Sequence, residues 1–298
     1  MPELPEVETL RRLLEPLLLG RSFDRVELDD PRLTAPRAPQ LVARALVGER
    51  VAALERRGKY LIVRFESGRC LLIHLRMSGS LRHASGLPLP DDRHRRAVVW
   101  LGDGSTLSYR DVRRFGTWLV LEQGELDPYL AQRLGAEPLE PSFRTRELAE
   151  RLAGRRGLVK AALLDQRMVA GIGNIYADEA LWRARLHPRR AAGGLTRQEL
   201  GALHRAIRAA LRQGISRQGS TLRDYALPDG GSGRMQHEFK VYGRTGEPCD
   251  RCATGIERIT VAGRGTWYCP ACQRLGDPEP SSQAAERPRG ERSSREAA

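Results

Sequence analysis

The sequence predicts an α+β protein with several domains: an N-terminal β-sandwich with flanking helices, a helical domain, and a hairpin held by four cysteines. Three observations lead to this fold class. Short predicted strands separated by Gly and Asp-Gly turns occupy positions 23–121, as in a β-sandwich. Helical periodicity then extends from about 128 to 223. Two Cys-x2-Cys pairs follow, with the spacing of a structural zinc site.

The chain of 298 residues is long enough for two domains with cores of their own. Composition changes along the chain mark the expected boundaries. We expect the sandwich domain at 2–125, the helical domain at 126–226, a glycine-rich mobile lid loop at 227–238, the zinc hairpin at 239–275 and a disordered tail at 276–298. The tail is rich in Ser, Arg, Glu, Ala and Pro and has too few apolar residues to form a core.

The first predicted helix covers 5–19, because proline stands at its start, Glu6 and Glu8 lie in its first turn and Gly20 follows as a stop. This helix would hold the first residues of the chain at a fixed point. Strands are expected at 51–54, 60–65, 71–75, 97–101, 106–109 and 117–121. Further helices are expected at 146–152, 159–164, 175–182 and 198–212.

The net charge of +13 and the pI near 10.3 are typical of a protein that binds a polyanion, and nucleic acid is the favoured partner. The tail does not explain this charge, since it mixes acidic and basic residues almost evenly. All but three of the 50 basic residues are arginine. The exceptions are Lys59, Lys160 and Lys240, and a lysine ammonium can shift its pKa and exchange protons where a guanidinium cannot. This contrast draws attention to Lys59.

No apolar run approaches the ~20 residues that a membrane span needs. The start of the chain carries Glu3, Glu6 and Glu8 where a signal peptide would be cationic. We therefore expect a cytoplasmic protein with no membrane contact.

Four of the five cysteines form the pairs Cys249/Cys252 and Cys269/Cys272, with sixteen residues between the pairs. Four thiolates at this spacing predict one structural Zn²⁺. Two disulfides are the alternative, which a cytoplasmic location disfavours. The fifth cysteine, Cys70, lies in an apolar run and is expected to be buried.

Removal of the initiator methionine would leave Pro2 as an N-terminal secondary amine. An α-amino group has a pKa of roughly 7.7–8.0, against about 10.4 for lysine, so part of it is unprotonated near neutral pH. Such an amine can attack a sugar aldehyde carbon and form a Schiff base. The alternative is that Pro2 merely leads into the first helix.

Six segments, together with the four cysteines, resemble the bacterial formamidopyrimidine-DNA glycosylase family. The resemblance runs in order from Pro2 to about Arg274. The segments are Pro2-Glu-Leu-Pro-Glu-Val-Glu-Thr9, Gly58-Lys-Tyr-Leu61, His74-Leu-Arg-Met-Ser-Gly-Ser80, Asp111-Val-Arg-Arg-Phe-Gly116, Gly171-Ile-Gly-Asn-Ile-Tyr-Ala177 and Val241-Tyr-Gly-Arg244.

The resemblance implies a bifunctional enzyme of base excision repair, acting as a monomer on double-stranded DNA that contains oxidised bases or abasic sites. Such an enzyme excises oxidised purines, namely 8-oxoguanine and formamidopyrimidines, through a Schiff base on the N-terminal proline. It then cleaves the strand by β,δ-elimination. The helical domain is expected to contain a helix–two-turns–helix motif around Asn174.

The resemblance also implies four catalytic residues: Pro2, Glu3, Lys59 and Arg264. Pro2 would be the nucleophile, and Glu3 beside it would shuttle a proton to the sugar. Lys59 would lie near lesion and phosphate, and Arg264, at the tip of the zinc hairpin, would bind the phosphate during δ-elimination. The alternatives are an ordinary acidic residue near a helix start for Glu3, and a solvated turn lysine for Lys59.

The resemblance implies DNA contacts by His94, Arg113, Arg156, Asn174, Met77 and Phe115. Apolar side chains offset the cost of unstacking when they fill the gap left by a flipped base, a role that suits Met77 and Phe115. Arg113 would hydrogen-bond the orphaned partner base. Without the resemblance, Met77 and Phe115 would be taken for core residues. The glycines before Asn174 would let backbone N–H groups approach a phosphate, and 216–237 would form a mobile lid over the flipped base.

The sequence departs from the family pattern at Arg96, where a second histidine is frequent, at Val112, where proline is common, and at Arg76, where glycine is frequent. Two other functions remain open. An endonuclease VIII-type enzyme would prefer oxidised pyrimidines. A catalytically silent protein would recognise damaged DNA without needing a free N-terminus.

Overall fold

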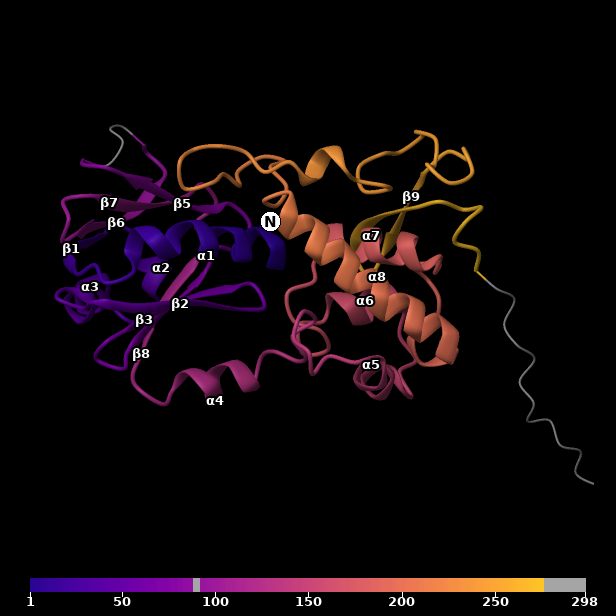
Figure 1. Cartoon of the computed structure of the whole chain (residues 1–298), viewed down its shortest axis with the longest axis horizontal. Coiled ribbons are helices and arrows are strands. Elements are labelled where there is room, and N and C mark those ends of the chain that lie inside the picture. Colours follow the sequence, from indigo (N-terminus) through magenta and orange to yellow (C-terminus); the bar gives the residue numbers. More distant parts are fainter. Residues whose placement is uncertain (88–91, 276–298) are drawn as a thin grey trace, which may run out of the picture.

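The computed structural model describes residues 1–87 and 92–275, and the predicted disordered tail lies outside them. The described part has two halves (Figure 1). Strands and the first helix form one half, while the later helices and a small hairpin form the other. The N-terminus lies between the two halves.

The strand-rich half consists of two antiparallel four-stranded sheets, which confirms the predicted sandwich. One sheet has the order β2-β3-β4-β8, with β2 at Val51–Arg57, β3 at Tyr60–Phe65, β4 at Cys70–His74 and β8 at Thr117–Leu121. The other has the order β1-β6-β7-β5, with β1 at Phe23–Leu28, β6 at Arg95–Leu101, β7 at Thr106–Asp111 and β5 at Gly79–Ala84.

The first helix, α1 (Leu4–Leu18), completes the core of the sandwich. Its apolar stripe, which includes Val7, Leu10 and Leu14, is buried in one cluster with side chains from both sheets. Leu4, at the start of the same helix, is instead buried in the core of the other half. Because one helix contributes to both cores, the residues before it are held at the boundary between the halves.

Three short helices were not expected from the sequence: α2 (Pro31–Thr34), α3 (Pro39–Leu46) and α4 (Leu126–Ala131). They have four, eight and six residues, and apolar periodicity is not recognisable over such short segments. Proline at the first helical position of α2 and α3 was the available signal.

The second half contains α5 (Thr145–Leu152), α6 (Val159–Leu164), α7 (Asn174–Ala184) and α8 (Arg197–Ser216), with a short 3₁₀ helix, η1, at Ala192–Gly194. The longest, α8, begins at a capping box in which Thr196 and Glu199 bond each other's backbone N–H groups. A glycine-rich loop follows and ends in the 3₁₀ helix η2 (Met235–His237). The antiparallel hairpin of β9 (Glu257–Val261) and β10 (Arg264–Tyr268) comes last.

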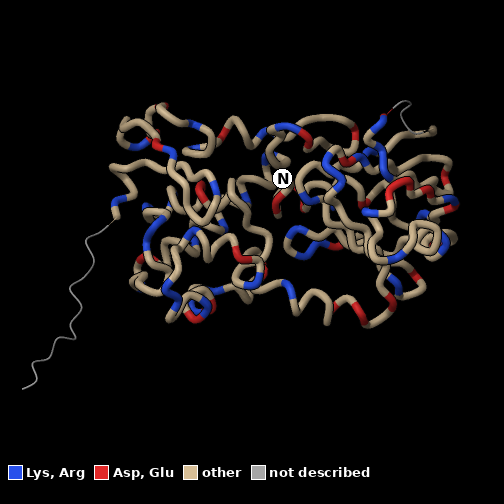
Figure 2. Tube along the Cα trace, turned by 180° about the vertical axis from the view of Figure 1, so that it is seen from behind, with Lys and Arg blue, Asp and Glu red and all other residues tan. Residues whose placement is uncertain are grey.

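Within residues 1–87 and 92–275, no helix is both long and apolar enough to span a membrane. Lysine and arginine are spread over both halves of the chain, as Figure 2 shows.

Candidate active site

The N-terminal segment is fastened between the two halves by its backbone. Pro2 is buried, and the N–H of Leu4 donates to the carbonyl oxygen of Gly171 at 3.0 Å. Gly171 has a φ of +86°, and a Cβ there would lie 2.6 Å from Leu4. Glycine is therefore required at 171 both for the backbone conformation and for the close approach of the first helix.

The carboxylate of Glu3 lies against the N-terminus of α7. The side chain is only 2% exposed and accepts N–H groups from Gly173 at 2.7 Å, Ile175 at 3.0 Å and Tyr176 at 3.4 Å. A helix N-terminus provides unpaired N–H donors and favours an acidic group. The expectation that the glycine turn presents these donors to a phosphate is wrong, because Glu3 already occupies them.

We expect Gly173→Ala to destabilise the protein by about 1–3 kcal/mol, since a Cβ at this position would lie 2.3 Å from the Glu3 carboxyl carbon and the packing could not absorb it. Urea unfolding measures the change. Gly157→Ala is the matched control, because a Cβ there has nothing within 4 Å. Equal midpoints for the two variants would refute the close approach.

Lys59 lies in the turn between β2 and β3 and is 5% exposed, so it is not a solvated turn lysine. The turn is held by Glu137, from the other half of the molecule. Its carboxylate accepts the Gly58 N–H at 2.9 Å and forms ion pairs of 2.7 Å with Arg56 and Arg57. Sequence reasoning missed Glu137, because nothing in its local pattern indicates this long-range contact.

Glu3 and Lys59 influence each other's protonation. Burial raises the pKa of Glu3 above its ordinary value, while the charge of Lys59 opposes that rise. Burial likewise lowers the pKa of Lys59, and the charge of Glu3 opposes that fall. The carboxyl therefore keeps its proton to higher pH, and the ammonium loses its proton more easily, than either group would in water.

Arg264 begins β10, and its electrostatic influence reaches Lys59. Gly265, the residue after Arg264, holds this end of the strand in position. The Gly265 carbonyl oxygen accepts from Asn174 Nδ2 at 2.9 Å and from Lys160 Nζ at 3.2 Å. Lys160 also forms a fully buried ion pair of 2.7 Å with Asp178. The hairpin that carries Arg264 is thus fixed to helices α6 and α7.

A pocket of about 470 Å³ opens beside the N-terminus. Met1 is part of its wall, so a retained initiator methionine would occupy space in it. The lining residues are Met1, Met77, Arg113, Ile175, Ser220, Leu222, Arg223, Asp224, Tyr225 and Tyr242. The sequence predicted a role for the segment 216–237 as a whole. It did not single out the residues of this segment that line the pocket, from Ser220 to Tyr225, because no motif distinguishes them.

The pocket wall is tied to the first helix through Glu6. Its carboxylate accepts the Ser220 N–H at 2.8 Å and the Tyr176 hydroxyl at 2.9 Å. The Tyr225 hydroxyl donates to the Glu6 backbone carbonyl at 3.2 Å. Sequence reasoning read Glu6 only as a first-turn helix residue.

Met77 and Phe115 are 36% and 51% exposed, so the view that they belong to the core is wrong. The Arg113 guanidinium lies 4.8 Å from the centre of the Phe115 ring, and the two side chains stack. Arg76, just before Met77, has a φ of +53°, the conformation that glycine adopts most easily. Its N–H donates to His74 Nδ1 at 3.0 Å.

The remaining predicted contacts lie on loops. His94 precedes β6, where its N–H donates to Asp92 Oδ1 at 3.0 Å. Arg156 is exposed in the turn between α5 and α6. Neither residue bonds to Glu3 or Lys59 within the described part of the chain, so the structure does not group them with the buried residues of the site.

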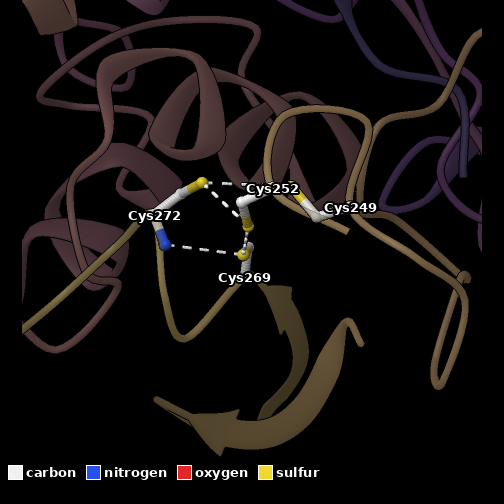
Figure 3. A group of neighbouring side chains, drawn as sticks. All are labelled: Cys249, Cys252, Cys269 and Cys272. Carbon is white, nitrogen blue, oxygen red and sulfur yellow. Dashed lines mark hydrogen bonds between the residues drawn. The ribbon is translucent and has the colours of Figure 1, made fainter. Parts of the chain in front are cut away.

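The four cysteines of the C-terminal segment converge, as Figure 3 shows. Their sulfur atoms all lie within 4.8 Å of one another, and the Cys249–Cys272, Cys252–Cys269 and Cys252–Cys272 pairs are 3.4–4.0 Å apart. Tetrahedral zinc with Zn–S bonds of about 2.3 Å places sulfurs roughly 3.8 Å apart. Disulfides need about 2.0 Å, and all five cysteines are free. The cluster therefore fits one structural zinc, and Cys70 is buried as expected.

Three family models match the chain in order. They are the formamidopyrimidine-DNA glycosylase N-terminal domain over residues 1–118, the H2TH domain of the same enzyme over 134–226, and a zinc finger found in FPG and IleRS over 246–275.

Curated relatives are similar over nearly the whole chain. Formamidopyrimidine-DNA glycosylase of Geobacillus kaustophilus is 49% identical over 277 residues, which cover 92% of this chain and 100% of the relative. The enzyme of Symbiobacterium thermophilum is 49% identical over 275 residues, covering 92% and 89%. A crystal structure of a Lactococcus lactis FPG mutant with Fapy-dG-containing DNA has a TM-score of 0.86 and 40% identity, covering 92% of this chain and 100% of that one.

These matches extend through the sandwich, the helix–two-turns–helix segment and the four-cysteine hairpin described above. Each of the relatives is more than one third identical to this chain over nine tenths of its length. The chain therefore belongs to the formamidopyrimidine-DNA glycosylase family.

Proposed function

We propose that this DNA glycosylase of base excision repair excises oxidised purines through a Schiff base on Pro2 and then cleaves the abasic strand by β,δ-elimination. The observation that carries the proposal is the N-terminus itself. Pro2 is buried beside a pocket, near the Glu3 carboxyl, whose pKa is raised, and Lys59, whose pKa is lowered.

Pro2 becomes the nucleophile once Met1 is removed. The amine attacks C1′ of the deoxyribose while the base leaves, and the resulting iminium carries no N–H to lose. It stays cationic and withdraws electrons from C2′, which promotes loss of the C2′ proton and elimination of the 3′-phosphate. Met1 lines the pocket, which supports the need for its removal.

Glu3 supplies a proton to the sugar ring oxygen as the ring opens. Its raised pKa lets the carboxyl hold a proton closer to neutral pH than an ordinary glutamate would. Lys59, with its lowered pKa, exchanges protons near the same site. Arg264 holds the phosphate that leaves in δ-elimination.

The DNA enters with its damaged base turned into the pocket beside Pro2, under the lid segment 216–237. Met77 and Phe115 fill the gap in the duplex, and Arg113 bonds the partner base. The DNA sugar–phosphate backbone is contacted by His94, Arg156 and Asn174. The stack of Arg113 on Phe115 supports a joint insertion of the two side chains.

Related structures support this class of substrate. Lactococcus lactis Fpg was solved with DNA containing Fapy-dG or an abasic site, and MutM with carbocyclic 8-oxo-G-containing DNA. The wild-type Lactococcus lactis enzyme was also solved with DNA containing an oxidised pyrimidine, so activity on oxidised pyrimidines is the second candidate. We expect the protein to act as a monomer.

The test is single-turnover excision from matched duplexes that carry 8-oxoguanine, a formamidopyrimidine or an oxidised pyrimidine. We expect purine lesions to be released fastest, with products of both β- and δ-elimination. Faster release of the pyrimidine lesion would favour the endonuclease VIII-type function. Tight binding without release of any base would favour a catalytically silent damage-binding protein.

We expect Glu3→Gln to slow base excision by about 10²–10⁴-fold, the usual contribution of a general acid. Cleavage of a preformed abasic site should change far less, because its sugar already opens to the aldehyde. In the wild-type protein, excision should fall as rising pH removes the Glu3 proton, but at a higher pH than for an unshifted carboxyl. Rate profiles between pH 5 and 9 measure this effect; equal losses in both reactions would contradict a proton donor specific to base release.

A further inference from the structure

The loop that carries Arg113 and Phe115 is anchored at two places. The buried Asp111 carboxylate joins the two ends of the loop: it accepts the Ser78 hydroxyl and the Gly116 N–H, the latter at 2.7 Å. The Arg113 N–H donates to Ser78 Oγ at 2.9 Å. Since Ser78 follows Met77, this arrangement joins the two DNA-probing loops.

The second anchor is a carboxylate from a distant part of the sandwich. Asp30 precedes α2, and its side chain is 3% exposed. Arg114 binds it with two nearly parallel hydrogen bonds, Nε to Oδ2 at 2.6 Å and Nη2 to Oδ1 at 2.8 Å. A bidentate pair of this kind fixes the orientation of the guanidinium as well as its position.

Arg114 needs such an anchor because of its backbone. Its φ is +58°, which costs free energy for a residue other than glycine and persists only when surrounding contacts impose it. Arg114 stands between Arg113 and Phe115, so its backbone conformation decides how those two exposed side chains leave the loop.

Asp30 holds the loop by a second route through Arg96. Arg96 Nε lies 3.9 Å from Asp30 Oδ2 and donates to the Asp111 carbonyl oxygen at 3.1 Å. Arg96 is one of the positions at which the sequence departs from the family pattern, and the structure gives it this bridging contact.

We propose that Asp30 is a positioning residue, which acts through Arg114 and Arg96 to hold Arg113 and Phe115 in the arrangement that enters the duplex. Asp30 itself touches no DNA in this scheme. The proposal rests on the proposed function, because it assigns to Asp30 the geometry of the side chains that fill the gap and contact the partner base.

The experiment uses Asp30→Asn in the full zinc-containing protein. Asparagine keeps the oxygen that accepts the Arg32 N–H at the start of α2, so the helix cap survives while the charge is lost. Asp103→Asn is the matched control, because Asp103 also caps a turn and pairs with an arginine, Arg21, in the same half.

Insertion of Arg113 and Phe115 into the duplex is measured by the fluorescence of 2-aminopurine placed opposite an abasic-site analogue. Total binding is measured by fluorescence anisotropy. We expect Asp30→Asn to lose most of the 2-aminopurine response and to bind about tenfold more weakly, the equivalent of one base contact. The preference of the protein for one base opposite the lesion over another should decrease together with the 2-aminopurine fluorescence change. Asp30→Glu should restore part of it, and Asp103→Asn should behave as the wild type.

An Asp30→Asn protein with the wild-type fluorescence response and partner-base preference would overturn the proposal. Failure of the proposed function gives a different result, since the wild-type protein itself would then release no base. If Asp30→Asn lowers the melting temperature no more than Asp103→Asn does, a general loss of stability cannot explain a missing response. If the Asp30→Asn protein unfolds, Arg114→Gln takes its place, because it removes the same bidentate pair by changing the more exposed partner. This variant must then lose the 2-aminopurine response.

Discussion

A version of the protein that keeps one extra residue ahead of Pro2 is expected to lose base excision and covalent trapping together, by on the order of 10³-fold or more. The extra residue turns the nucleophilic amine into an amide nitrogen, which cannot form a Schiff base. It also occupies the pocket in which Met1 lies. Single-turnover excision and borohydride trapping on an 8-oxoguanine duplex measure both effects.

Pro2→Gly tests the same amine with its position unchanged, and we expect it to abolish trapping as well, because the locked secondary amine is gone. A residue added at the C-terminus is the control and should leave both reactions intact. Normal trapping by protein whose extension is verified by mass would show that the nucleophile is elsewhere.

Removal of zinc is expected to weaken lesion binding strongly while leaving the sandwich half folded. Metal binding contributes roughly 10–16 kcal/mol in small zinc modules, so the hairpin should unfold without it. Unfolding would release the Gly265 carbonyl from Asn174 and Lys160, and Arg264 would lose its place. Loss of the proposed phosphate contacts of Arg264 and Asn174, at about 1.5–3 kcal/mol each, would weaken binding at least about a hundredfold.

Cys252→Ser, or treatment with a strong chelator, tests this dependence through anisotropy with a labelled lesion duplex. Cys70→Ser is the matched control, because Cys70 lies in β4 and outside the cluster. Retained zinc and retained affinity in Cys252→Ser would contradict the four-cysteine site. Loss of zinc without loss of affinity would show that the hairpin does not carry DNA contacts.

Much of the fold could be predicted because its signals are local. The strands Tyr60–Phe65 and Thr117–Leu121 and the helix Val159–Leu164 have the bounds expected from their patterns. The zinc site was predictable from cysteine spacing alone. Helices α2 and α3 were missed, because segments of four and eight residues are too short to show the apolar periodicity of a helix.

The site was only partly predictable, because its residues are held by contacts between distant segments. Sequence reasoning marked Glu3 and Lys59 as candidates. The partner of Glu3, Gly173, lies 170 residues away just before α7, and Glu137, which holds the turn of Lys59, lies 79 residues from Gly58. Glycines that suggested a phosphate site serve instead for close packing against Glu3 and Leu4. The exposure of Met77 and Phe115 could not be predicted from their apolar character, which favours burial in a core.

The most direct test identifies the atom that becomes bonded to the sugar. The protein is trapped with borohydride on an abasic or 8-oxoguanine duplex, digested with trypsin and nuclease, and analysed by mass spectrometry. We expect the deoxyribose remnant on the peptide that begins at Pro2, with Met1 absent. A remnant on Lys59 or Lys160, or a trapped protein that still carries Met1, would contradict the assignment of Pro2 as the nucleophile.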